Sequence, residues 1–208
     1  MNNDQLHPVL EFDEKTNKGM LFDTRDGQTY KVVKIGNQIW LAENFRYLTL
    51  NEKDISFVYD NNNKYLEKGY GRLYNWETAK QIAPTGWHLP TNEDLQELIN
   101  FIIKDNNLPE NEDCLGSYLK SVSDWKSWKG IVNNDKYGFN AKPAGCFKYD
   151  SSSFIAQGEN AYFYSATEYI ENYSYYYELR NNSEYFNNGC TLYGKAVRFS
   201  VRLIKDNL

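Results

Sequence analysis

The strongest structural pattern in the sequence is a helix-like repeat of apolar residues that begins after Thr91. Leucine or isoleucine occupies positions 95, 98, 99, 102 and 103, which places these side chains on one face of an α-helix. Thr91 is a typical N-cap, and the acidic side chains of Glu93 and Asp94 suit the positive end of a helix dipole. The polar residues 105–107 end the repeat. Such a helix must cover another element, and a sheet is the element that the rest of the chain supplies.

Most of the remaining pattern predicts short β-strands. Residues 28–33 and 38–42 flank the Gly36-Asn37 turn and predict a β-hairpin. Further strands are expected at residues 145–147, 162–166, 173–179 and 196–203, with a strand start within 138–141. A second short helix is expected over residues 74–82, ahead of Pro84, and a helical turn within 115–121. The pattern therefore predicts an α+β domain.

The last predicted strand alternates apolar and polar residues. Val197, Phe199, Val201 and Leu203 alternate with Arg198, Ser200 and Arg202. Because successive side chains of a strand point to opposite faces, this alternation predicts a strand with one face buried and the other in water.

The length fits one domain with an N-terminal extension. The chain has 208 residues, of which 41% are hydrophobic and 25% charged, so a packed core is expected. Residues 1–20 are polar and irregular and predict an arm or an extra strand, and residues 21–208 form the domain.

Charge and local motifs exclude several classes of function. The net charge of −5 argues against a nucleic-acid-binding surface, which needs a basic footprint. No apolar run is long enough to span a membrane. The N-terminus carries no signal-peptide pattern. The three cysteines Cys114, Cys146 and Cys190 lack a CxxC spacing and are expected to be thiols, although one disulfide bridge among them stays open.

Catalytic and metal-binding patterns are weak. The two histidines are His7, in the polar arm, and His88, which we expect to make a structural hydrogen bond near a helix start. The run 60–64 departs from the calcium-loop pattern at Lys64, so it predicts a solvated turn. We therefore predict no enzymatic activity and no cofactor, although the asparagine-rich loops could supply oxygen ligands to a structural calcium ion.

Aromatic residues are abundant and cluster late in the chain. They make up 16% of the sequence, and nine of the 18 tyrosines lie between residues 162 and 193. Each buried tyrosine hydroxyl needs a hydrogen-bond partner, and tyrosine-rich surfaces are effective in recognition. Some of these rings are therefore expected to face a ligand, while others pack on the sheet.

Several phrases of the sequence together carry a family signature. They occur in order at residues 30–44, 70–76, 83–91, 137–145, 164–168 and 199–202. In these phrases the chain resembles the Fibrobacter succinogenes major paralogous domain, from about residue 22 to its end. The resemblance implies a C-type-lectin-like fold with two helices, a mostly antiparallel sheet and long irregular loops. It also implies kinship with the formylglycine-generating enzyme fold and with the variable ligand-binding proteins of retroelements.

The resemblance also implies a cellular location and a binding site. Family members are typically secreted or surface proteins of Bacteroidetes and Fibrobacteres, often lipid-anchored. The related variable proteins display their ligand-contacting residues in the C-terminal part of this fold. By that resemblance, and because flat rings suit sugars and protein hot spots, the candidate ligand-binding residues are Tyr173, Tyr175, Tyr177, Arg180 and Tyr185, joined from the middle of the chain by Trp125 and Trp128.

Three hypotheses follow for the function. The first is a non-catalytic module that recognises a glycan or a protein at the bacterial surface. The second is an intracellular protein-interaction or immunity-type partner, which Met1 and the missing signal peptide favour. The third is an oxidase like the formylglycine-generating enzymes, which requires two thiols that converge in space.

Overall fold

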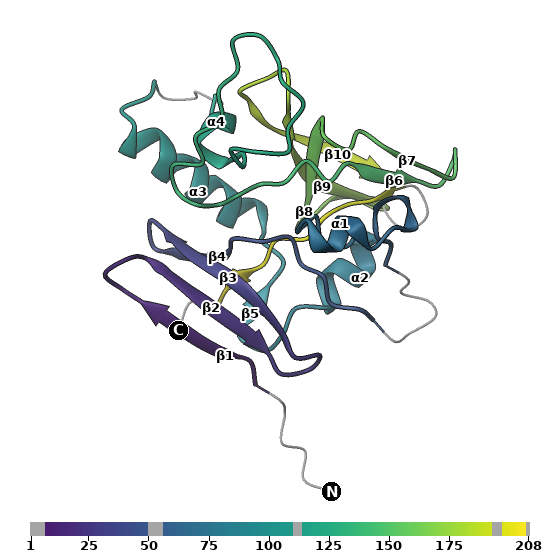
Figure 1. Cartoon of the computed structure of the whole chain (residues 1–208), viewed down its shortest axis with the longest axis horizontal. Coiled ribbons are helices and arrows are strands. Elements are labelled where there is room, and N and C mark those ends of the chain that lie inside the picture. Colours follow the sequence, from purple (N-terminus) through teal and green to yellow (C-terminus); the bar gives the residue numbers. More distant parts are fainter. Residues whose placement is uncertain (1–6, 50–55, 110–113, 193–196, 207–208) are drawn as a thin grey trace, which may run out of the picture.

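The computed structural model describes residues 7–49, 56–109, 114–192 and 197–206. These parts of the chain form an α+β fold whose described strands all pair antiparallel in three curled sheets (Figure 1). The helices are α1 (Lys64–Glu67), α2 (Trp76–Gln81), α3 (Asn92–Asp105) and α4 (Gly116–Leu119). The strands are β1 (Val9–Asp13), β2 (Lys18–Asp23), β3 (Gln28–Ile35), β4 (Gln38–Leu41), β5 (Trp87–His88), β6 (Cys146–Lys148), β7 (Ser153–Ile155), β8 (Asn160–Ile170), β9 (Tyr173–Arg180), β10 (Phe186–Leu192), β11 (Val197–Arg198) and β12 (Ile204–Lys205).

The largest sheet joins the two ends of the described chain. Its strand order is β1-β2-β3-β4-β12-β5, so β12 lies between two strands from the first half of the sequence. Residues 9–20 contribute to two strands, in agreement with the extra-strand alternative and not with an arm, because β1 pairs along its length with β2, and β2 pairs with β3. The predicted boundary at residue 20 falls inside β2, and residues 1–6 of the predicted arm lie outside the described residues.

The other two sheets have three strands each. One has the order β10-β9-β8, and the other has the order β11-β6-β7. Both lie on the far side of α3 and α2 from the β1-to-β4 hairpins (Figure 1). The strand start predicted within residues 138–141 is wrong, since this segment contributes only an isolated bridge between Ala141 and Lys120.

Helix α3 begins as the sequence predicts. Thr91 accepts a hydrogen bond from the Asp94 amide, and the Asp94 carboxylate accepts one from the Thr91 amide, which completes a capping box. Four of the five apolar residues of its repeat are buried, and the fifth, Ile103, packs at the edge of the core. These residues fill the space between the six-stranded sheet and the β8–β10 sheet, which explains why this helix needs an apolar face.

The six-stranded sheet is covered on both faces. Val33 belongs to the core around α3, while its neighbour Val32 belongs to a second core around α2. Because both faces of β3 are buried, the strand can hold consecutive valines without exposing either of them.

The C-terminal residues 197–204 run through the middle of the molecule. Every one of these residues is buried, including Arg198, Ser200 and Arg202. The prediction of one strand with a solvent-exposed face is therefore wrong, and residue 196 of that prediction lies outside the described residues. The segment forms two short strands, β11 and β12. Between them, Phe199 forms an isolated β-bridge with Tyr74, and Ser200 forms one with Phe163. We call residues 197–205 the central segment.

Arg202 in the central segment is buried without an ion pair among the described residues. Its guanidinium donates to the Asn44 side-chain oxygen at 2.9 Å and to the Leu41 carbonyl at 3.0 Å. It also donates to the carbonyls of Phe139 and Asn140. Burial lowers the pKa of Arg202 to about 9. Arg202 was thus predicted to reach water, but instead it links the central segment to residues 41–44 and 139–140.

His88 fastens the end of the described chain to the start of α3. Its Nδ1 atom lies 2.5 Å from an Asp206 oxygen, and its Nε2 atom lies 3.1 Å from an Asp94 oxygen. The expected structural hydrogen bond is therefore present. These two carboxylates, the Asp94 bond first, raise the pKa of His88 above its usual value despite partial burial.

The raised pKa of His88 predicts a pH-dependent contribution to stability. A base whose folded pKa is raised stabilises the fold below its unfolded pKa of about 6.5, and the effect fades as the pH rises through the folded value. We expect a His88→Gln variant to be less stable than wild type at pH 5.5, by less than about 1 kcal/mol because the pair is half exposed, and the difference to shrink by pH 8. Urea unfolding at several pH values measures this difference. A gap that widens with pH would contradict the assignment.

Candidate ligand-binding site

The loop that follows α4 carries two tryptophans in different roles. We call residues 122–133 the Trp loop. Trp125 is half-buried against the α3 core, and its indole nitrogen donates to the Ala141 carbonyl at 3.1 Å. Trp128 is 55% exposed. Trp125 therefore fixes the base of the loop, and Trp128 is presented to solvent.

The Trp loop encloses a pocket of about 270 Å³. Both tryptophans line it, together with Lys126, Ile131, Asn133 and Asn181. Asn181 follows directly after β9, so the pocket joins the Trp loop to the C-terminal strands. The pocket is thus lined by aromatic, amide and lysine residues.

Hydrogen bonds hold Asn181 against the Trp loop. Its side-chain nitrogen donates to the Lys126 carbonyl at 3.2 Å, and its backbone amide donates to the Glu159 carbonyl at 2.7 Å. The Lys126 amide in turn donates to the Gly158 carbonyl at 2.7 Å. Lys126 and Glu159 also form an exposed ion pair, which contributes little by itself. The backbone contacts are what fix the geometry of the pocket wall.

A buried lysine lies beneath this arrangement. Lys120 is fully buried, and its Nζ atom donates to the carbonyls of Arg180 at 3.0 Å and Ser183 at 2.8 Å. The same atom lies 5.4 Å from the centre of the Trp125 ring. Burial lowers the pKa of Lys120 to about 8. Lys120 therefore ties the turn after β9 to the base of the Trp loop.

One polar atom at the pocket lacks a partner. The Asn133 side-chain oxygen is shielded from solvent and accepts no hydrogen bond from the described residues. A buried acceptor without a donor costs about 1–3 kcal/mol, and such atoms in native proteins usually have a functional or solvent partner. The Asn133 side chain thus brings an unused hydrogen-bond acceptor to the wall of the pocket.

The candidate residues predicted from the sequence separate into two surface groups and one core residue. Trp125 and Trp128 line the pocket, and Arg180 and Tyr185 flank Asn181 along the chain. Arg180 is exposed and paired with Glu178, and Tyr185 is 48% exposed. Tyr177 is buried and packs against the Phe186 ring at 5.3 Å, so it has no surface to offer a ligand.

The remaining two candidates lie at the opposite end of β9. Tyr173 and Arg180 are the two ends of this strand, about 23 Å apart at 3.3 Å per residue. Tyr175 packs edge-on against Tyr169, with ring centres 5.1 Å apart. Tyr169, Ile170 and Tyr173 are 47%, 56% and 37% exposed, and with Tyr175 they form what we call the hairpin patch. Tyr193 lies outside the described residues.

Of the nine residues that line the pocket, only Trp125 and Trp128 were predicted from the sequence. Lys126, Asn133 and Asn181 lie in polar, turn-rich stretches that carry no motif. Asn181 could have been predicted from its position next to Arg180, in the loop between two strands rich in aromatic residues.

Metal ligands, disulfides and membrane-spanning helices were also considered in the described ranges. No group of three or more histidine, cysteine or acidic side chains is placed to hold a metal ion within those ranges. No disulfide joins any two of the cysteines Cys114, Cys146 and Cys190. No helix in the described parts is both long and apolar enough to cross a membrane.

Comparisons with known proteins identify the family. The Fibrobacter succinogenes major domain matches residues 33–205, which include both three-stranded sheets, the Trp loop and the central segment, whereas β1, β2 and most of β3 precede the match. No curated protein and no solved structure matches the chain. The chain belongs to the Fibrobacter succinogenes major domain family.

Proposed function

We propose that this protein is a non-catalytic binding module that recognises a carbohydrate at the pocket of the Trp loop. The observation that carries the proposal is the exposed Trp128 ring at the edge of a pocket whose wall holds Asn133 and Asn181. A flat indole suits the apolar face of a sugar ring, and amide side chains exchange hydrogen bonds with sugar hydroxyls.

The size of the pocket favours a single sugar unit. Its volume of about 270 Å³ lies just below the range of about 300–1,000 Å³ that is common for small-molecule sites. The unpartnered Asn133 oxygen would accept a hydrogen bond from a hydroxyl group. Because the pocket wall is held by backbone hydrogen bonds and by Lys120, little ordering is required when a ligand binds.

We further propose that the protein has a C-type-lectin-like fold and is located at the bacterial surface. A C-type-lectin-like fold and a location at the bacterial surface agree with the family membership and with the motifs that carry it. A protein ligand is the second candidate, and the exposed hairpin patch, which lies away from the Trp loop, favours it.

A glycan array followed by calorimetry tests the carbohydrate site. The chain is applied to an array of bacterial and plant oligosaccharides, and the affinity for a positive glycan is measured for wild type and for Trp128→Ala. We expect Trp128→Ala to weaken binding at least 30-fold, which corresponds to a hot spot of about 2 kcal/mol, because stacking on the indole is lost. The melting temperature should be unchanged, since Trp128 is mostly in water.

Two further variants place the site. Trp128→Tyr keeps a ring and should retain most of the affinity, whereas Tyr173→Ala removes an exposed ring from the hairpin patch and should have no effect. Binding that survives in Trp128→Ala but disappears in Tyr173→Ala would move the site to the hairpin patch. An array without any positive glycan would reject the carbohydrate proposal.

A further inference from the structure

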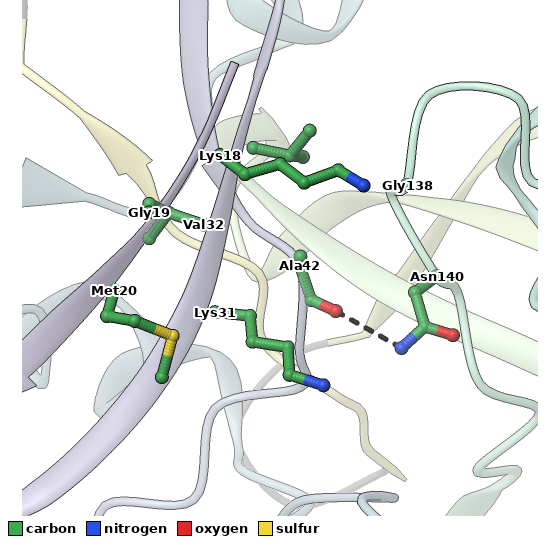
Figure 2. A pocket seen from close by; sticks show the side chains of 9 residues that line it. Lys18, Gly19, Met20, Lys31, Val32, Ala42, Gly138 and Asn140 are labelled. Atoms are coloured by element: carbon green, nitrogen blue, oxygen red, sulfur yellow. Dashed lines mark hydrogen bonds between the residues drawn. The ribbon is translucent and has the colours of Figure 1, made fainter. Parts of the chain in front are cut away.

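A second and larger pocket lies against β2 and β3 of the six-stranded sheet, on the face to which Val33 points. Its volume is about 480 Å³, and it lies between β2, β3 and the loop around residues 138–140 (Figure 2). Val32, Val33 and Ala42, which are all buried, are among the residues that line it. This pocket shares no residue with the pocket of the Trp loop.

Strand pairing places two lysines on the same face at this pocket. Lys18 of β2 is opposite Val33, and Lys31 of β3 is opposite Met20. Lys18 and Lys31 are therefore diagonal neighbours, whose Cβ atoms lie about 7–8 Å apart in such a ladder. Figure 2 shows both lysine side chains extending over the pocket toward the loop of Gly138 and Asn140. Both ammonium groups therefore belong to the lining of one pocket.

The opposite wall is held close to the sheet. The Asn140 side chain donates to the Ala42 carbonyl at 3.3 Å (Figure 2). The Asn140 backbone amide donates to an Asp135 oxygen at 2.8 Å. Gly138 adopts a positive φ of 72°, and a Cβ atom there would lie 3.7 Å from a Val33 methyl group. The loop thus packs on the sheet at ordinary contact distance and gives the pocket a defined second side.

The two lysines are unpaired in an acidic protein. Neither ammonium group has a carboxylate within 4.0 Å among the residues that the structure describes, whereas Lys34 on the same strand is paired with Glu14 at 3.2 Å. Two acids lie nearby: the Glu43 carboxylate accepts from the Lys31 backbone amide at 2.9 Å and pairs with Arg46 at 3.8 Å, and the Asp135 carboxylate interacts with Lys18 but accepts its hydrogen bond from Asn140. Two free cations therefore border an apolar floor in a chain with a net charge of −5.

We propose that this pocket binds a small organic anion with an apolar body. Lys18 and Lys31 hold the carboxylate, and the apolar body lies on Met20, Val33 and Ala42. The volume is well within the usual range of small-molecule sites, and a few polar groups around an apolar floor are the usual composition of such sites. Single exposed lysines are common on strands, but here the two project over one cavity.

Octanoate is the probe that tests this site. Binding of octanoate to the full chain is measured by calorimetry for wild type and for the double variant Lys18→Gln/Lys31→Gln. We expect the double variant to bind at least tenfold more weakly, because both cationic partners are lost. The matched control, Lys104→Gln/Lys148→Gln, removes two exposed lysines elsewhere and should change the affinity less than twofold. Trp128→Ala should bind octanoate as wild type does, whatever the outcome of the glycan experiment.

Two other probes separate charge from apolar contact. Octanamide has the same chain without the charge, and inorganic phosphate has charge without a chain, so both should bind at least tenfold more weakly than octanoate. Equal binding of octanamide would overturn the role of the lysines, and equal binding of phosphate would overturn the role of the apolar floor. Failure of wild type to bind octanoate at millimolar concentration, or equal binding by the double variant, would overturn the proposal as a whole.

Discussion

Replacement of Arg202 by methionine is expected to lower the free energy of unfolding by about 3–5 kcal/mol. Methionine fills much of the same volume but donates no hydrogen bond. The Asn44 side-chain oxygen and the carbonyls of Leu41, Phe139 and Asn140 would each lose a charged donor inside the protein. Three of these acceptors are backbone atoms, so no compensating side-chain change can remove them. Urea unfolding followed by circular dichroism measures the loss.

The matched control for this experiment is Arg180→Met. Arg180, unlike Arg202, has a carboxylate partner, but its side chain is 50% exposed, so its removal should cost less than about 1 kcal/mol. A loss below about 1 kcal/mol in Arg202→Met would mean that the cost of burying the guanidinium offsets its hydrogen bonds, and the role that we assign to Arg202 would be wrong.

Replacement of Gly145 by alanine is expected to destabilise the fold by more than about 4 kcal/mol. Gly145 has a φ of 66°, in the left-handed region, and a Cβ atom built there lies 2.1 Å from the Ile155 carbonyl oxygen and 2.8 Å from the Gln157 amide nitrogen. Both neighbours are backbone atoms, so β6 and β7 would have to separate. Thermal unfolding measures the change.

A second glycine separates the two causes of this expected loss. Gly86 has a φ of 80°, but a Cβ atom there would meet nothing within 4 Å. Gly86→Ala should therefore show only the conformational penalty, about 1–2 kcal/mol. Equal losses in the two variants would mean that the approach of the Ile155 carbonyl is readily relieved.

Local patterns in the sequence predicted the local elements well. Helix α3 is defined by its cap residues, Thr91 and Asp94, and by the apolar repeat that follows them directly in the sequence. The structure places the helix and its cap where these residues predict. The Gly36-Asn37 turn likewise joins β3 to β4 as expected. In both cases the interactions that decide the structure are contained in a short stretch of chain.

The central segment could not be predicted in the same way. Its alternation of apolar and polar residues is that of a half-exposed strand, because a strand pattern carries no information about what covers its polar face. The acceptors of Arg202 come from residues 41, 44, 139 and 140, which are distant in the sequence. Only the tertiary structure brings them together.

Only part of the candidate site could be predicted, because its other residues are brought together by contacts between distant parts of the sequence. Aromatic content pointed to Trp128, which the structure places on the surface. Tyr177 was predicted to face a ligand, but both faces of β9 pack: Tyr176 contacts the core around α2, and Tyr177 contacts the core around α3. The partnership of Asn181 with the Trp loop depends on hydrogen bonds between segments about 55 residues apart.

The position of the central segment has a consequence for how the protein is made. β12 completes a sheet that starts with the first strands of the chain, and residues 197–204 fill the space between elements that were synthesised much earlier. Contacts between residues this far apart slow folding, because a long loop must close before they form. The hairpins of β1 to β4 and the helix α3 can form on the ribosome, but their shared interior remains open to water until the last strand emerges. Until residues 197–204 emerge, the nascent chain therefore exposes apolar surface, which is the condition that chaperones recognise.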